Sequence, residues 1–186
     1  MKIAPVTEGW NDGQRDWTFV KDPSRDIHAW EQQTGVQLPE SYLKFMTQFN
    51  GGRVYPRLFY HTVPEEILPP VTRLTFVGGL YHWKTVMSHF RGETFGDGQP
   101  KGYLAIGDTP GGIEILMGLK GENHGKIFCW PHNNEDWGSE DNREVYLLAS
   151  DFSTFLKMLF DEDDESDFKA WGTPLIQKLA KDFEPA

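Results

Sequence analysis

A short amphipathic helix constrains the fold of this chain more than any other segment does. Residues 38–52 read LPESYLKFMTQFNGG. Pro39 can open a helix, because its missing N–H would have no helical partner in the first turn. Apolar residues then recur at i, i+3, i+4 and i+7 and form one face, made of Tyr42, Phe45, Met46 and Phe49. The Asn-Gly-Gly that follows tolerates left-handed backbone angles and closes the helix. The pattern predicts a helix that docks against a core.

A second helix is predicted just before this one. Asp22 and Pro23 suit the N-cap and the first helical position, and Gly35 suits the end of the helix. Ile27 and Trp30 have the spacing of residues on one inward face. This helix, like the next, is expected to pack on the core.

The middle of the chain mixes irregular structure with a third helix. Residues 53–77 hold short apolar clusters broken by four prolines, which indicates irregular structure with one or two edge strands. A series with helical spacing follows, made of Leu80, Trp83, Val86, Met87 and Phe90. It predicts a helix with Trp83 on the core face and Tyr81 off it.

Beyond residue 102 the apolar period shortens from about 3.6 to 2, which is the period of a strand. Strands are predicted at residues 103–106, 113–119, 127–130 and 145–149. Short glycine-rich turns at 107–112 and 121–125 join the first three of them. These three strands should therefore form an antiparallel meander.

The C-terminal part predicts two more helices. Ser150 or Asp151 caps the first, whose apolar face is made of Phe152, Phe155, Leu156 and Leu159. Pro174 begins the second. Between them, residues 161–167 carry six acidic residues in seven positions and are interpreted as a solvated linker. In the open alternative, these acidic residues attract a basic partner and raise its association rate more than its affinity.

The predicted fold class is α+β: a single domain with an antiparallel sheet of about four to six strands, flanked by N- and C-terminal helices. Residues 1–21 are polar with scattered aromatics and are interpreted as an extended arm or edge strand. The α+β domain spans residues 22–160. Residues 161–186 form the acidic linker and a C-terminal helix packed on the same domain.

Composition favours a folded protein of a reducing compartment. The formal net charge is −10 and the pI is about 5.0, so the chain should repel nucleic acid and anionic membranes and attract basic proteins. Cys129 is the only cysteine and cannot form an internal disulfide. No apolar run approaches the roughly 20 residues that span a bilayer, and the N-terminus lacks the apolar region of a signal peptide. A cytoplasmic location is expected.

The ordered motifs resemble a known family. The pattern LP-x-x-Y-x-x-F-x-x-x-x-NGG in residues 38–52, preceded by IHAWE at 27–31, resembles the SUKH superfamily of fungal cell-wall-synthesis regulators and bacterial toxin-immunity proteins. Three further segments are similar to the family's in the same order, at residues 104–116, 125–132 and 147–156. The resemblance covers roughly residues 25–160 and implies a protein-binding module. Its motifs are structural, so it carries no catalytic residue to this chain.

One constellation has the residue types of a metal or catalytic site. His124, Cys129 and His132 have an H-x4-C-x2-H spacing, but a structural zinc site needs four ligands and no second cysteine is present. Cys129 lies in mid-strand and is interpreted as a buried, inert thiol. No catalytic, metal or cofactor-binding residue is predicted. A cleft gathering His124, His132 and Asp136 is the arrangement that would instead indicate an enzyme.

The candidate partner-binding residues lie on an acidic connection between two predicted strands. They are Glu135, Asp136, Trp137, Glu140 and Asp141. An aromatic anchor ringed by charge is typical of hot spots on protein interfaces. In the alternative interpretation, Trp137 folds back over the sheet edge while the carboxylates stay solvated.

The resulting hypothesis is a cytoplasmic, non-enzymatic immunity protein that binds and neutralises a cognate bacterial toxin domain, a nuclease, by occlusion. Its carboxylates would occupy the basic groove that such a toxin offers to phosphate. The expected partner is a basic protein domain, with no nucleic acid, membrane or cofactor. The alternative is a housekeeping protein-interaction module of the cell-wall-synthesis-regulator type, with no toxin partner.

Overall fold

The computed structural model describes residues 1–5, 10–11, 14–15, 21–64, 67, 73–110, 112–131, 144–161 and 174–185. The helices in these residues are α1 (Ser24–Thr34), α2 (Glu40–Phe49), α3 (Trp83–Phe90), α4 (Phe152–Lys157) and α6 (Pro174–Leu179). The strands are β1 (Lys2–Ala4), β2 (Trp10–Asn11), β3 (Gln14–Arg15), β4 (Arg53–Tyr55), β5 (Leu58–Tyr60), β6 (Leu74–Phe76), β7 (Gly79–Leu80), β8 (Tyr103–Asp108), β9 (Ile113–Gly118), β10 (Ile127–Pro131), β11 (Tyr146–Ala149) and β12 (Lys181–Asp182). The expected α+β class is confirmed.

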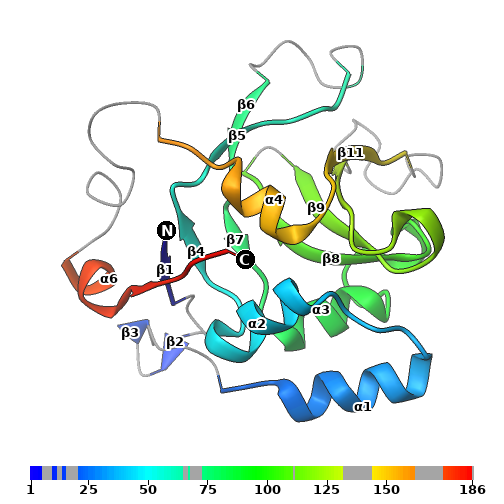
Figure 1. The fold of residues 1–186 in the computed structure, drawn as a ribbon, viewed down its shortest axis with the longest axis horizontal. Helices are drawn as coiled ribbons and strands as arrows, with labels where there is room; N and C mark the ends of the chain where they lie inside the picture. The colour runs from blue at the N-terminus through cyan, green and yellow to red at the C-terminus, as the bar shows by residue number, and fades with distance from the viewer. Residues whose placement is uncertain are drawn as a thin grey trace.

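A five-stranded antiparallel sheet forms the centre of the structure, in the order β11-β10-β9-β8-β7 (Figure 1). The predicted meander is confirmed, because β9 pairs with β8 on one side and with β10 on the other. All six residues of β9 are buried. Cys129 pairs with Ile115 and belongs to the main core, whereas Phe128 pairs with Leu116 in a second apolar cluster. Both faces of the sheet are therefore covered.

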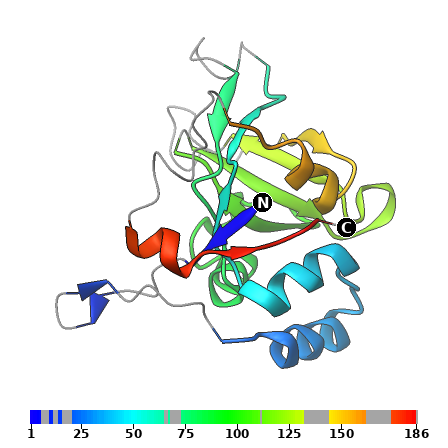
Figure 2. The same ribbon diagram turned by 60° about the vertical axis from the view of Figure 1, so that its left-hand side comes forward.

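Helix α2 docks on the core as its pattern predicts, with all four residues of the apolar face buried. The ring centroids of Tyr42 and Phe45 lie 5.2 and 5.4 Å from that of Phe152 on α4. These are the spacings of favourable aromatic pairs. Helix α1 packs on α2 from outside, farther from the five-stranded sheet (Figure 2). The two helices thus form a layer beneath the sheet.

The first residues differ from the expected arm or edge strand. β1 is the central strand of a three-stranded antiparallel sheet in the order β12-β1-β4, and Ile3 and Ala4 are fully buried. The amino group of Met1 donates a hydrogen bond to the carbonyl of Phe183 over 3.0 Å, so the two ends of the chain lie side by side (Figure 1). A three-residue strand is too short for its alternation to be detected, and its partners are distant in sequence.

The predicted third helix is shorter than its apolar series. Leu80 belongs to β7, because its backbone exchanges two hydrogen bonds of 2.9 Å with Gly52 and pairs with Gly107 of β8. The helix begins at Trp83 and is capped by the ring of His82. At the other end, Phe90 is 40% exposed and does not join the core. Backbone pairing thus overrides the helical spacing at the start of this segment.

Both predicted C-terminal helices are present, whereas residues 162–167 of the predicted acidic linker lie outside the described residues. Helix α4 begins after Asp151, whose Oδ1 accepts a hydrogen bond of 2.7 Å from the backbone N–H of Thr154. The predicted apolar face of this helix is buried. Helix α6 begins at Pro174. The described part of residues 53–77 holds three short strands, one more than the upper expectation, and two of them, β5 and β6, pair with each other.

Candidate functional site

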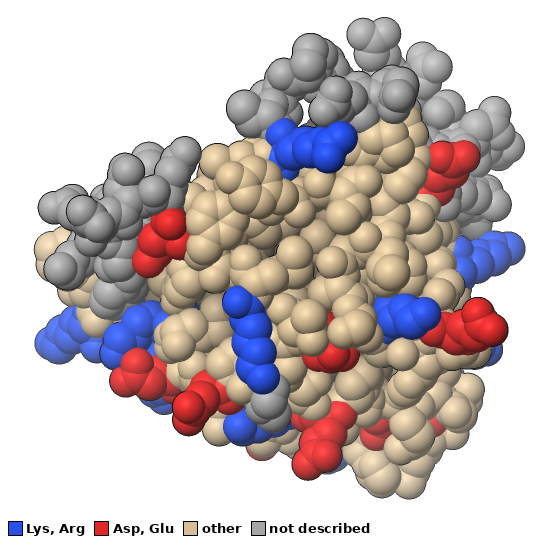
Figure 3. All heavy atoms as spheres, turned by 45° about the horizontal axis from the view of Figure 1, so that its top comes forward, with Lys and Arg blue, Asp and Glu red and all other residues tan. Residues whose placement is uncertain are grey.

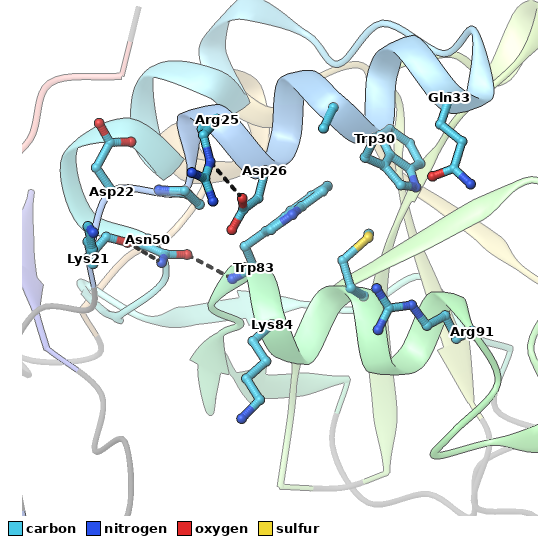
Figure 4. A pocket seen from close by; sticks show the side chains of 13 residues that line it. Lys21, Asp22, Arg25, Asp26, Trp30, Gln33, Asn50, Trp83, Lys84 and Arg91 are labelled. Atoms are coloured by element: carbon cyan, nitrogen blue, oxygen red, sulfur yellow. Dashed lines mark hydrogen bonds and ion pairs between the residues drawn. The ribbon is translucent and has the colours of Figure 1, made fainter.

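A groove of about 710 Å³ lies between α1 and α3 (Figure 4). Its floor is built from buried side chains and its rim from exposed, charged ones. The floor includes Trp30, Asn50, Trp83 and Met87, and the rim carries Lys21, Asp22, Arg25, Asp26, Lys84 and Arg91. The volume lies in the range of protein ligand sites, roughly 300–1,000 Å³.

Two tryptophans form the aromatic part of the floor. Trp30 comes from α1 and Trp83 from the first turn of α3, and their rings meet edge to face with centroids 5.7 Å apart. Phe90 contacts Trp30 in the same way at 5.4 Å. The indole nitrogen of Trp30 is buried and has no hydrogen-bond partner among the described residues. The floor therefore holds an unused donor inside an apolar surface.

Asn50 joins the three segments that shape the groove. It ends α2 in the left-handed conformation, with φ of 47°. Its side-chain N–H donates to the carbonyl of Lys21, and its side-chain oxygen accepts from the backbone N–H of Trp83, both over 2.7 Å (Figure 4). The entry to α1, the end of α2 and the start of α3 are thus held together. Sequence reasoning assigned Asn50 only to helix termination and missed this role.

The rim has more positive than negative charge. Among the described residues, four cations and two carboxylates line it. Asp22 accepts a hydrogen bond of 2.9 Å from the backbone N–H of Ser24, and the hydrogen bonds from Ser24 hold its pKa below the ordinary 3.8. Arg25 pairs with Asp26 at 3.5 Å. These contacts partly occupy both carboxylates of the rim.

The lysines of the rim have fewer partners. Lys21 and Lys84 form no ion pair with any of the described residues, while Arg91 pairs with Glu93 at 3.8 Å. The groove is therefore locally basic on a chain whose net charge is −10. On the face drawn in Figure 3, described acidic and basic side chains lie next to one another along the lower part and the sides, and few lie on the upper centre.

A buried polar cluster lies on another part of the sheet. Glu114 of β9 is only 4% exposed, and its carboxylate accepts a hydrogen bond from the Tyr81 hydroxyl over 2.9 Å. Burial, followed by the nearby charge of Glu114, raises the pKa of Tyr81. Tyr81 also stacks on His89 with centroids 4.8 Å apart. This arrangement satisfies a carboxylate within the second apolar cluster, which the simple alternation of β9 could not reveal.

The described structure contains none of the candidate partner-binding residues predicted from the sequence, and it contains only part of the predicted His-Cys-His spacing. All five candidate partner-binding residues, Glu135, Asp136, Trp137, Glu140 and Asp141, lie outside the described residues, as does His132. His124 is exposed, and its Nε2 lies 2.7 Å from the carbonyl oxygen of Gln37. Among the described residues no group of three or more His, Cys, Asp or Glu side chains could hold a metal ion.

Cys129 is the buried thiol that the sequence predicts. Its side chain is inaccessible, and burial raises its pKa to about 12. A thiol with such a pKa is not ionised at neutral pH and is a poor nucleophile. The groove itself is lined by no serine, threonine, cysteine or histidine among its described residues.

No helix among the described residues combines the length and apolarity needed to cross a membrane.

Comparisons with known proteins show what this chain is similar to. YokK of Bacillus subtilis (strain 168), an uncharacterized SPbeta prophage-derived protein, is 24% identical in an alignment of length 149 that covers 74% of each chain. The sequence model of the SMI1 / KNR4 family (SUKH-1) matches residues 23–158. The α+β domain described above therefore belongs to the SMI1 / KNR4 family (SUKH-1).

Proposed function

We propose that this chain is a non-enzymatic immunity protein that binds a cognate bacterial toxin domain, a nuclease, and neutralises it by occlusion. The observation that carries the proposal is the family match over residues 23–158, because a SUKH-type protein works through protein contacts. The α1–α3 groove supports it, since an aromatic floor under a charged rim is the composition of a protein-interface hot spot.

The proposed mechanism is steric and electrostatic. A stoichiometric complex covers the active-site surface of the toxin, and carboxylates of this chain compete with phosphate for its basic groups. Glu135, Asp136, Trp137, Glu140 and Asp141 are proposed as one contact surface. The protein acts in the cytoplasm, where a nuclease toxin would reach its substrate, and no cofactor takes part.

Co-expression with the product of the adjacent reading frame tests this function. We expect the two chains to co-purify and the host cell to survive expression of the toxin only when this chain is present. Replacing Glu135, Asp136, Glu140 and Asp141 by Asn or Gln should weaken binding and reduce its salt dependence. Failure of any neighbouring toxin to bind, together with no protection of cells, would contradict the proposal.

The second candidate is a housekeeping interaction module that recruits a partner without inhibiting a toxin. The same family match supports it, because the family is named after SMI1 and KNR4 and the resemblance of the sequence motifs extends to fungal cell-wall-synthesis regulators. A gene with no toxin-like neighbour and a deletion that alters growth without any toxin would favour this role. A gene that is dispensable until the neighbouring toxin is expressed would favour immunity.

A further inference from the structure

We propose that the α1–α3 groove binds an acidic segment of the partner protein that carries a large apolar side chain. This inference rests on the proposed function, and it names the partner chemistry of one surface. The sequence predicts that the acidic residues in 135–141 contact a basic surface of the partner. The rim of the groove is basic, so the groove would contact a different, acidic part of the partner.

The charge of the rim selects for carboxylates. Lys84 and Arg91 lie along α3, and Lys21 lies at the entry to α1 (Figure 4). All three side chains are exposed. Lys21 and Lys84 pair with no carboxylate among the described residues, and the Arg91–Glu93 pair at 3.8 Å is exposed on both sides. Such charges interact over about 8 Å at physiological salt and steer an acidic segment into the groove.

The floor selects for an apolar side chain next to those carboxylates. Trp30, Trp83 and Met87 form it, and Ala29 on α1 adds exposed apolar surface beside it. The indole N–H of Trp30 is buried at the floor and has no partner among the described residues, which leaves an unsatisfied donor beside this apolar surface. Cations at the rim and a donor at the floor both require acceptors on the occupant.

The same features oppose a nucleic acid as occupant. Bases stack on open aromatic faces. Trp30 and Trp83 are only 7% and 5% exposed, so neither offers such a face. An apolar side chain needs no open ring face, because exposed Ala29 and the aliphatic stems of the rim lysines also line the groove.

Peptide binding tests the inference without knowledge of the toxin. The probes are a fluorescein-labelled peptide with one tryptophan among glutamates, its isomer with lysines in place of the glutamates, and a single-stranded DNA oligonucleotide. We expect the glutamate peptide to bind most tightly. The double substitution Lys84→Glu and Arg91→Glu should weaken that binding about tenfold. Lys120→Glu, which reverses an exposed lysine outside the groove, should leave it unchanged.

A site-specific readout places the peptide in the groove. In protein with ¹⁵N-labelled tryptophans, the indole signal of Trp30, assigned through Trp30→Phe, should shift when the glutamate peptide binds. Equal binding to wild type and to the double variant, tighter binding of the lysine peptide or the oligonucleotide, or an unmoved Trp30 signal would each overturn the inference.

Neutralisation assays separate this inference from the proposed function. If the double variant protects cells from the neighbouring toxin as well as wild type does, the groove is not the contact and the inference fails while the immunity function stands. If no toxin is neutralised but the glutamate peptide binds and shifts Trp30, the immunity function fails and the groove assignment stands. Loss of protection in the double variant, with Lys120→Glu still protective, supports both.

Discussion

At the scale of single residues, the Asn-Gly-Gly that follows α2 has a packing reason as well as a conformational one. Gly51 has φ of +90°, and a Cβ there would lie 2.6 Å from the backbone nitrogen of His82. At Gly52 a Cβ would meet the Ile3 side chain at 2.7 Å. The two glycines let β1 and the start of α3 approach the end of α2. Together with Asn50, they place the floor of the groove.

Gly51→Ala should destabilise the protein by about 3 kcal/mol, because it adds both a strained backbone angle and a backbone clash. The matched control is Gly121→Ala, where φ is +59° but a Cβ would meet no atom within 4 Å. That substitution should cost about 1 kcal/mol, the conformational term alone. Urea unfolding at neutral pH measures both values. Equal losses would show that the close approach to His82 has no energetic weight.

At the scale of secondary-structure elements, caps and aromatic pairs decide where helices begin and what they cover. Asp151 caps α4 through the backbone N–H of Thr154, and this hydrogen bond is the main reason that the carboxyl pKa lies below its ordinary 3.8. The cap orients a helix of only six residues, whose Phe152 packs on two rings of α2. A helix of this length depends on its cap and its packing more than on propensity.

Asp151→Ala should lower the free energy of unfolding by about 1 kcal/mol at pH 7. Because folding lowers the pKa of this carboxyl, its ionised form stabilises the fold above pH 3.8, and that contribution disappears as the pH falls through the folded-state pKa. The difference between wild type and variant should therefore shrink toward pH 3. Urea unfolding across this pH range provides the measurement.

Asp151→Asn is the matched variant for this titration, because asparagine also caps helices but does not titrate. It should keep most of the stability at pH 7 and lose the part of the pH dependence that belongs to Asp151. A wild-type protein and Asp151→Asn variant with identical pH profiles would contradict the assignment.

At the scale of the whole molecule, the two ends of the chain close the fold together. β1 lies between β4 and β12, so the first residues hold the last ones in the same sheet. Phe183 is buried and packs on Phe45 and Phe49 of α2 with ring centroids 5.8 and 5.4 Å away. The C-terminal segment is thereby part of the core around the docking helix.

Phe183→Ala should destabilise the protein by about 3–5 kcal/mol, the usual cost of truncating a buried phenylalanine. Tyr60→Ala is the control, because Tyr60 is 59% exposed and its ring stacks on that of Phe160, so its loss should cost about 1 kcal/mol. Thermal and urea unfolding of both variants measure the difference. A Phe183→Ala protein as stable as the control would show that the C-terminal segment only rests on the surface.

Local chemistry was sufficient to predict much of the architecture. The period of the apolar residues identified α2 and the meander of β8, β9 and β10, because one face of each element must be buried whatever its neighbours are. Proline, glycine and aspartate located several helix ends through backbone geometry alone. The family resemblance also came from such segments, since core pattern and turn chemistry are local in sequence.

Only the tertiary structure decided the contacts between distant segments. β1 is a central strand, and the sequence could not show this because its partners, β4 and β12, lie far along the chain. The groove needs Lys21, Asn50 and Trp83 together, and no spacing in the sequence links the three. Its basic rim was likewise hidden in a chain of net charge −10, because charge acts through distance in space and not through composition.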